Sequence, residues 1–125
     1  MLRAINTNKQ SDAFKRLWFN DQDHDLFLWL DSSMQPVSFQ FSYRTYSDIY
    51  SEHVISWKKG MGYTHDKIDD GEPADGDYKM TPILVPDGAF DYKKIAQRFK
   101  SISKDIDEDI RDFIYQKLCN YPQET

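Results

Sequence analysis

The stretch "LFLWLDSSMQPVSFQF", residues 26–41, contains two runs of apolar residues separated by a short polar turn. If residues 32–35 turn the chain, three apolar pairs stack on one side of a hairpin: Leu30 with Val37, Leu28 with Phe39, and Leu26 with Phe41. A one-residue slip would move these side chains to opposite faces, so the match specifies the register. The stretch therefore predicts an antiparallel β-hairpin whose aliphatic side faces the core.

The other side of this hairpin is half aromatic and half polar. Phe27 and Trp29 alternate with the leucines and must point away from them, beside Ser38, Gln40 and Ser42 of the second strand. Contiguous exposed aromatic residues often mark an interaction surface, and tryptophan is favoured at the centre of interfaces. We therefore predict a binding site that includes Phe27, Trp29, Ser38 and Gln40.

The spacing of apolar residues in the rest of the chain predicts the remaining strands and helices. Apolar residues alternate or form short bursts up to about residue 70, whereas from residue 91 to residue 118 they recur at every third or fourth position. We expect strands near 14–19, 25–31, 36–44, 52–58 and 63–69. A short strand at 83–85 lies between two prolines, which suits either a sheet edge or a connection. Two helices follow, the first capped by Asp91 and the second by Asp105 or Asp107. The predicted fold is a single α+β domain, residues 1–125: an antiparallel meander of four to six strands with two C-terminal helices packed on one face.

Charge and composition exclude several classes of partner. The chain has 21 acidic and 16 basic residues, and its net charge of -5 would repel phosphate backbones and anionic lipid. We expect neither nucleic acid nor a membrane as partner. The longest apolar run, residues 26–30, is too short to span a bilayer, and residues 1–10 lack an apolar signal core, so a cytoplasmic location is expected. Cys119 is the single cysteine and predicts neither a disulfide nor a zinc site.

The segment "HDKIDDGEPADGD", residues 65–77, contains six acidic residues in thirteen positions. Aligned with a twelve-residue calcium loop from Asp66 to Asp77, it has Gly71 at the required sharp turn. However, Ile68 occupies a ligand position, and Asp77 replaces the usual bidentate glutamate. We therefore expect a solvated loop and assign no metal or cofactor, while a metal-dependent regulator using residues 66–77 is retained as a second alternative.

Acid–base catalysis by this segment is the first alternative. His65 with Asp69, Asp70 or Glu72 would suit a small hydrolase or lyase if burial separated their pKa values. The glycine, proline and acid content argues for exposure, so no catalytic residue is assigned and these four remain candidate binding residues. His53 and His65 flank the "KKGMG" turn, residues 58–62, and a hairpin there would allow them to approach each other. We do not expect a metal site of these two histidines and an aspartate, because three ligands would have to converge from separate elements.

No nucleotide-binding loop, zinc spacing or nucleophile motif accompanies these features. We predict a small soluble, non-catalytic binding or protein-interaction module that uses the aromatic and polar face of its sheet. The expected occupant of that face is a protein partner or a second copy of the chain, with a small ligand as a further alternative.

Overall fold

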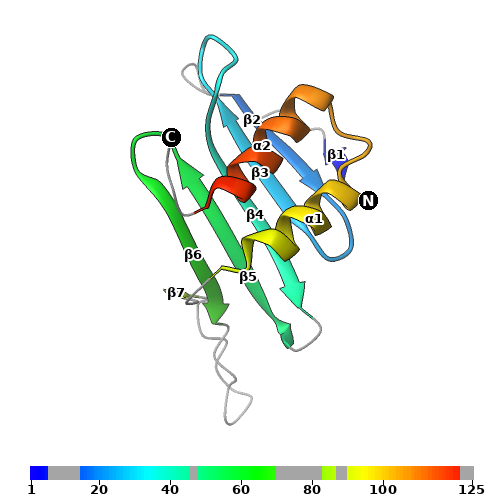
Figure 1. The fold of residues 1–125 in the computed structure, drawn as a ribbon, viewed down its shortest axis with the longest axis vertical. Coiled ribbons are helices and arrows are strands. Elements are labelled where there is room, and N and C mark those ends of the chain that lie inside the picture. Colours follow the sequence, from blue (N-terminus) through cyan, green and yellow to red (C-terminus); the bar gives the residue numbers. More distant parts are fainter. Residues whose placement is uncertain (6–14, 46–47, 70–82, 87–89, 122–125) are drawn as a thin grey trace.

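The computed structural model describes residues 1–5, 15–45, 48–69, 83–86 and 90–121 (Figure 1). It contains a seven-stranded antiparallel sheet followed by two helices, in the order β1 (Arg3–Ile5), β2 (Lys15–Asn20), β3 (Asp25–Leu30), β4 (Pro36–Thr45), β5 (Asp48–Lys58), β6 (Gly62–Asp69), β7 (Ile83–Pro86), α1 (Tyr92–Ile102) and α2 (Glu108–Asn120). The order of strands in the sheet is the order in the chain, which makes it a meander. The predicted α+β class and architecture are confirmed, and the sheet gains the short strand β1.

Both helices cross the same face of the sheet (Figure 1). The core lies between these two layers: Phe41 of β4 meets Phe99 of α1 edge-on, with 5.5 Å between ring centroids, and Trp57 of β5 meets Phe113 of α2 in the same way at 5.5 Å. The N-terminal segment closes one end of this layer, where the fully buried Leu2 donates its backbone N–H to the carbonyl of Ile102 at 2.8 Å. The described chain contains no helix with the length and hydropathy needed to cross a membrane.

The hairpin of β3 and β4 confirms two of the three predicted pairs. Leu26 pairs with Phe41 and Leu28 pairs with Phe39, and all four side chains are fully buried. The third predicted pair is wrong: Leu30 pairs with Pro36.

A shift in register between Trp29 and Leu30 accounts for this difference. The turn before β4 is tightened by Asp31, whose carboxylate accepts the backbone N–H groups of Ser33 and Gln35 at 2.9 and 3.0 Å. Pro36 then enters the strand with no N–H to give to the ladder, and a β-bulge accommodates the extra residue. Val37 therefore lines a pocket beside Trp29 and does not face Leu30.

Local side-chain chemistry fixes the start of each helix. Asp91 caps α1, as predicted, and accepts the backbone N–H of Lys94 at 3.4 Å. Asp107, rather than Asp105, caps α2 and accepts the N–H of Asp109 at 3.0 Å. These bonds satisfy backbone donors that a helix N-terminus leaves without an internal acceptor. The turn between β5 and β6 uses Gly60 and Gly62 at φ 82° and 83°, which agrees with the prediction that these are turn glycines.

Candidate functional site

The candidate site lies on the open face, defined here as the face of the sheet opposite α1 and α2. Strand pairing arranges its side chains in transverse rows that run perpendicular to the strands. One row, called the cation row below, contains Arg16, Trp29, Ser38 and Lys58, which are consecutive register partners on β2, β3, β4 and β5. The adjacent row contains Trp18, Phe27, Gln40 and Ser56. Register therefore brings together residues that are as much as 42 positions apart in the sequence, from Arg16 to Lys58.

Three aromatic rings form a continuous stack on this face. Phe27 lies between the two tryptophans, with ring centroids 5.5 Å from Trp18 and 6.1 Å from Trp29 and interplanar angles of 12° and 28°. All three side chains are half-buried. Their faces are thus partly accessible, and the stack holds them in a fixed arrangement before any partner arrives.

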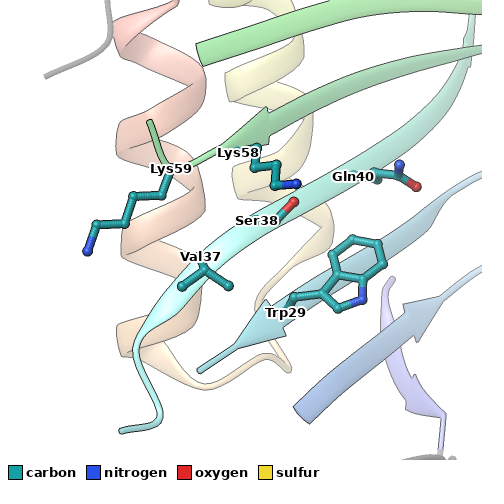
Figure 2. A pocket seen from close by; sticks show the side chains of 6 residues that line it. All are labelled: Trp29, Val37, Ser38, Gln40, Lys58 and Lys59. Atoms are coloured by element: carbon teal, nitrogen blue, oxygen red, sulfur yellow. The ribbon is translucent and has the colours of Figure 1, made fainter. Parts of the chain in front are cut away.

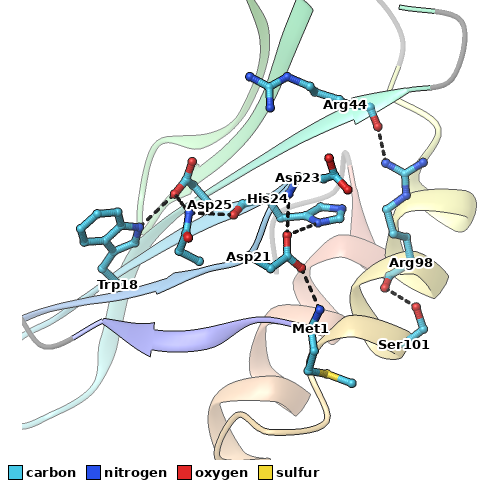
Figure 3. Close-up of polar contacts among 10 residues, drawn as sticks. Met1, Trp18, Asp21, Asp23, His24, Asp25, Arg44, Arg98 and Ser101 are labelled. Carbon is cyan, nitrogen blue, oxygen red and sulfur yellow. Dashed lines mark hydrogen bonds and ion pairs between the residues drawn. The ribbon is translucent and has the colours of Figure 1, made fainter. Parts of the chain in front are cut away.

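Hydrogen bonds anchor one end of the stack (Figure 3). The indole Nε1–H of Trp18 donates to Asp25 Oδ1 at 3.0 Å, and the same oxygen accepts the side-chain amide of Asn20 at 2.7 Å. Asp25 is therefore engaged with its own neighbours. Farther along the open face, Ser42 and Val54 are buried at 8% and 5% exposure, so the accessible part is the end that carries Trp29 and Lys58.

A pocket of about 590 Å³ lies at this accessible end. Its lining comes from three neighbouring strands and the turn after β5: Trp29, Val37, Ser38, Gln40, Lys58 and Lys59. Figure 2 views it with the helices behind the strands, and shows Lys58 extending over β4 toward Ser38 and Gln40 while Lys59 points away from Trp29. The volume is in the range of pockets that hold small molecules or a few residues of a peptide.

The polar side chains of the site differ in how much of their hydrogen-bonding capacity is already used within the protein. Ser38 donates its hydroxyl to the carbonyl of Trp57 at 3.0 Å, so its oxygen retains only acceptor capacity. Gln40 is exposed, and its side-chain amide makes no hydrogen bond with any residue in the described ranges. Its amide can both donate to and accept from a bound chain.

Arg16 is the cation most closely tied to the aromatic stack. Its guanidinium carbon lies 5.3 Å from the centroid of the Phe27 ring, in a cation–π arrangement. Its Nε is buried and has no hydrogen-bond partner among the residues that the structure describes. Lys58 and Lys59, at the other side of the pocket, are exposed, and within the same residues neither forms an ion pair. The site thus combines an aromatic platform with cations that carry no counter-charge in the described chain.

The structure brings four of the predicted binding residues together. Phe27, Trp29, Ser38 and Gln40 share the accessible end of the open face, as the hairpin pattern predicts. His65 lies on the helix-covered face instead. Asp69 ends β6, where its backbone pairs with Ile83 of β7. Asp70 and Glu72 lie outside the described residues, so the predicted acid–base group is not described as a whole.

His65 belongs to a cluster of rings beneath the start of α1. Its Nε2 is hydrogen-bonded to the hydroxyl of Tyr43 at 2.6 Å, and its ring centroid is 4.9 Å from that of Phe90. The ring centroid of His53 lies 5.2 Å from that of Tyr43 and 6.5 Å from that of His65, so the hairpin brings the two histidines close together. No group of three metal-ligating side chains is present in the part of the chain that the structure describes. In the calcium-loop alignment, the first four positions, 66–69, are extended strand; the first three pair with strands on both sides, and Asp69 pairs with β7 alone.

A second polar cluster surrounds Asp21 at the turn between β2 and β3 (Figure 3). Its carboxylate contacts His24 Nδ1 at 2.8 Å and the Met1 ammonium at 3.2 Å, and accepts the backbone N–H of Asp23 at 2.9 Å. Burial raises the pKa of Asp21, but the hydrogen bonds from His24 and the Asp23 amide, with the nearby positive charges, outweigh burial and leave this pKa below its usual value. The His24 ring stacks on Phe41 at 5.6 Å, which ties the turn to the core.

Sequence reasoning missed five residues of the site: Arg16, Trp18, Val37, Lys58 and Lys59. The signal for Trp18 was available, because Leu17 and Phe19 flank it and alternation then places it on the same face as Phe27. Arg16 and Lys58 join the site only through the combined register of three hairpins. No single segment of sequence contains that information.

No protein-family model, curated protein or solved structure matches this chain, so the assignment of a function depends on the geometry of the open face.

Proposed function

We propose that this protein is a non-catalytic binding module that holds a segment of a protein partner on the accessible end of its open face. The observation that carries the proposal is the half-buried stack of Trp18, Phe27 and Trp29 beside a pocket of about 590 Å³. Half-buried rings that already stack on one another lose little conformational entropy when a partner covers them. An amide and two lysines around the pocket supply polar contacts at its rim.

The partner is expected to bind through side-chain contacts on the face of the sheet. In the middle of the sheet, the backbone groups of β3, β4 and β5 are already paired with neighbouring strands. A bound segment therefore cannot extend the sheet there by adding a strand, and must be recognised through Trp29, Gln40 and their neighbours. This mode depends on the aromatic anchor, and removal of one ring is expected to weaken binding strongly.

A peptide-display selection with an unbiased library tests the proposal. Selected peptides should bind the wild-type protein, lose at least about tenfold in affinity with Trp29→Ala, and keep their affinity with Tyr115→Ala, a matched aromatic change on α2. The melting temperatures of both variants are measured first. In the wild-type protein, the indole N–H resonance of Trp29 should shift on addition of peptide, which locates the contact without a substitution.

Two results would refute this function. The first is that selected peptides bind equally well to wild type and Trp29→Ala; the second is that they shift only resonances of the helix layer. Sedimentation of the protein alone identifies a second copy as the occupant if wild type is a dimer and Trp29→Ala is a folded monomer. Displacement of the peptides by a small molecule at the same resonances would identify a small ligand.

A further inference from the structure

The cation row carries two positive charges on either side of an indole. Arg16 and Lys58 are the ends of four consecutive register partners, with Trp29 and Ser38 between them. Neighbouring strands in a sheet are about 4.8 Å apart, so three spacings place the two cationic residues about 14 Å apart along the row. Beyond Lys58 the next register partner is Gly62, which has no side chain, so the row ends at the lysine.

Neither cation is neutralised within the described residues. The buried Nε of Arg16 makes no hydrogen bond, and Lys58 forms no ion pair. Asp25 is the acidic residue nearest to Trp18 in the described rows. Its carboxylate already accepts hydrogen bonds from Trp18 and Asn20 of the neighbouring strand β2. The Arg16 guanidinium carbon lies 5.3 Å from the Phe27 centroid, so the aromatic ring restricts where this cation can lie. A guanidinium offers several N–H donors in a planar fork that matches a carboxylate. The row therefore has the charge expected of a surface that recognises an acidic group, although the chain as a whole has a net charge of -5.

We propose that the cation row binds an extended acidic peptide segment that crosses β2 to β5 and presents a carboxylate, an apolar side chain and a second carboxylate at alternate positions. This inference rests on the proposed function and specifies the chemistry of its partner. Alternate residues of an extended chain share one face, and five residues span about 13 Å between the first and the fifth. The two outer carboxylates then reach Arg16 and Lys58 while the central side chain covers the indole of Trp29.

Single-stranded nucleic acid also combines negative charge with stacking groups, but the open face favours a peptide. Asp25 and Asp66 lie on the same face in the row beyond Trp18 and would repel a continuous phosphate backbone. Proteins that bind single-stranded nucleic acid place many cations along the path of the phosphate backbone. Here two cations lie on either side of one aromatic ring, at a separation that two side chains of one extended peptide can span. A short acidic segment matches that pattern.

Three blocked peptides of the same length test the inference, with the central sequences Glu-Ser-Phe-Ser-Glu, Gln-Ser-Phe-Ser-Gln and Lys-Ser-Phe-Ser-Lys. Fluorescence anisotropy should show the glutamate peptide binding at least about tenfold more tightly than the glutamine peptide, which corresponds to about 1.4 kcal/mol shared between two ion pairs. The advantage should decrease as salt is raised, because exposed charges are screened.

Charge reversal in the protein supplies the matched variants. Arg16→Glu and Lys58→Glu should each abolish the preference for the glutamate peptide, and the double variant should prefer the lysine peptide. Lys104→Glu changes the net charge equally but lies in the exposed connection between α1 and α2, and should leave the preference unchanged.

The outcomes separate this inference from the proposed function. Equal binding of the glutamate and glutamine peptides, lost in Trp29→Ala, would overturn the acidic partner while supporting the binding face. An oligothymidylate that binds more tightly than the glutamate peptide and shifts the Trp29 resonance would overturn it in favour of nucleic acid. Absence of any Trp29-dependent binding by these peptides and by the selected ones would refute both.

Discussion

Replacement of Phe39 by alanine tests the assignment of the two faces of the sheet. Phe39 is fully buried and stacks on Trp57 with ring centroids 6.1 Å apart. An aromatic side chain buries about 150–250 Å², which at about 25 cal/mol per Å² amounts to about 4–6 kcal/mol. The alanine methyl retains part of that area and the emptied space adds a cavity cost, so Phe39→Ala should reduce the free energy of unfolding by about 3–5 kcal/mol.

Two neighbours on the same strand calibrate the measurement. Gln40 is exposed on the open face, so Gln40→Ala should change stability by less than about 0.5 kcal/mol. Ser38→Ala should cost about 1 kcal/mol, because it removes the hydrogen bond to the Trp57 carbonyl.

The assay is urea unfolding followed by circular dichroism, with the denaturant slopes compared to establish that each transition stays two-state. If Phe39→Ala is unfolded in the absence of urea, Phe39→Leu should show a smaller loss in the same direction. Equal shifts for Phe39→Ala and Gln40→Ala would refute the assignment of core and open faces.

Three further predictions concern a polar cluster, a turn and a helix cap. Because the pKa of Asp21 is lowered in the folded state, its carboxylate stabilises the fold above its unfolded pKa of about 3.9, and this contribution is lost as the pH falls through the lower folded value. Asp21→Asn should therefore be less stable than wild type at pH 7, and thermal melts of the two should converge in strong acid; a difference independent of pH would contradict this. Gly60→Ala should lower the free energy of unfolding by about 1–2 kcal/mol in urea melts, because Gly60 has a φ of 82°. An added Cβ would meet no atom within 4 Å, so backbone strain is the only source of this cost. An unchanged midpoint would therefore show that residue 60 does not keep the left-handed conformation. Asp107→Ala should cost about 0.5–2 kcal/mol through loss of the α2 cap, whereas Asp105→Ala should be nearly silent, and the reverse order would move the start of the helix.

The central hairpin was predictable from sequence because its apolar residues alternate strictly. Leu28 and Phe39 are paired as expected, since a slip of one residue would move one of the two side chains to the opposite face. The position of Val37 was not predictable in the same way. The alternation of apolar residues includes Val37, but the turn and Pro36 introduce a bulge that the apolar pattern does not indicate. The strand β1 was missed because Arg3–Ile5 is too short to show a period.

Only the part of the candidate site that lies within the hairpin of β3 and β4 was predicted from the sequence. Phe27 and Trp29 follow directly from the hairpin, whereas Arg16 and Lys58 reach them through strand pairs on either side. The position of each strand relative to β3 depends on the register of every hairpin between them. An error of one residue in the turn before β5 would have placed Lys58 on the opposite face. The chemistry of the partner therefore becomes visible only when four strands are aligned.

The meander has a consequence for the order in which the protein assembles. Every strand pairs with its neighbours in the chain, so the sheet can grow one strand at a time as synthesis proceeds, through contacts that are local in sequence. The helices that cover Phe41 and Trp57 are encoded last, at 92–102 and 108–120. Until those residues leave the ribosome, the nascent sheet exposes its apolar side to solvent, and a chain in this state is prone to aggregate. A ribosome-stalled chain from which residues 1–90 have emerged should accordingly recruit chaperones, and emergence of both helices should release them.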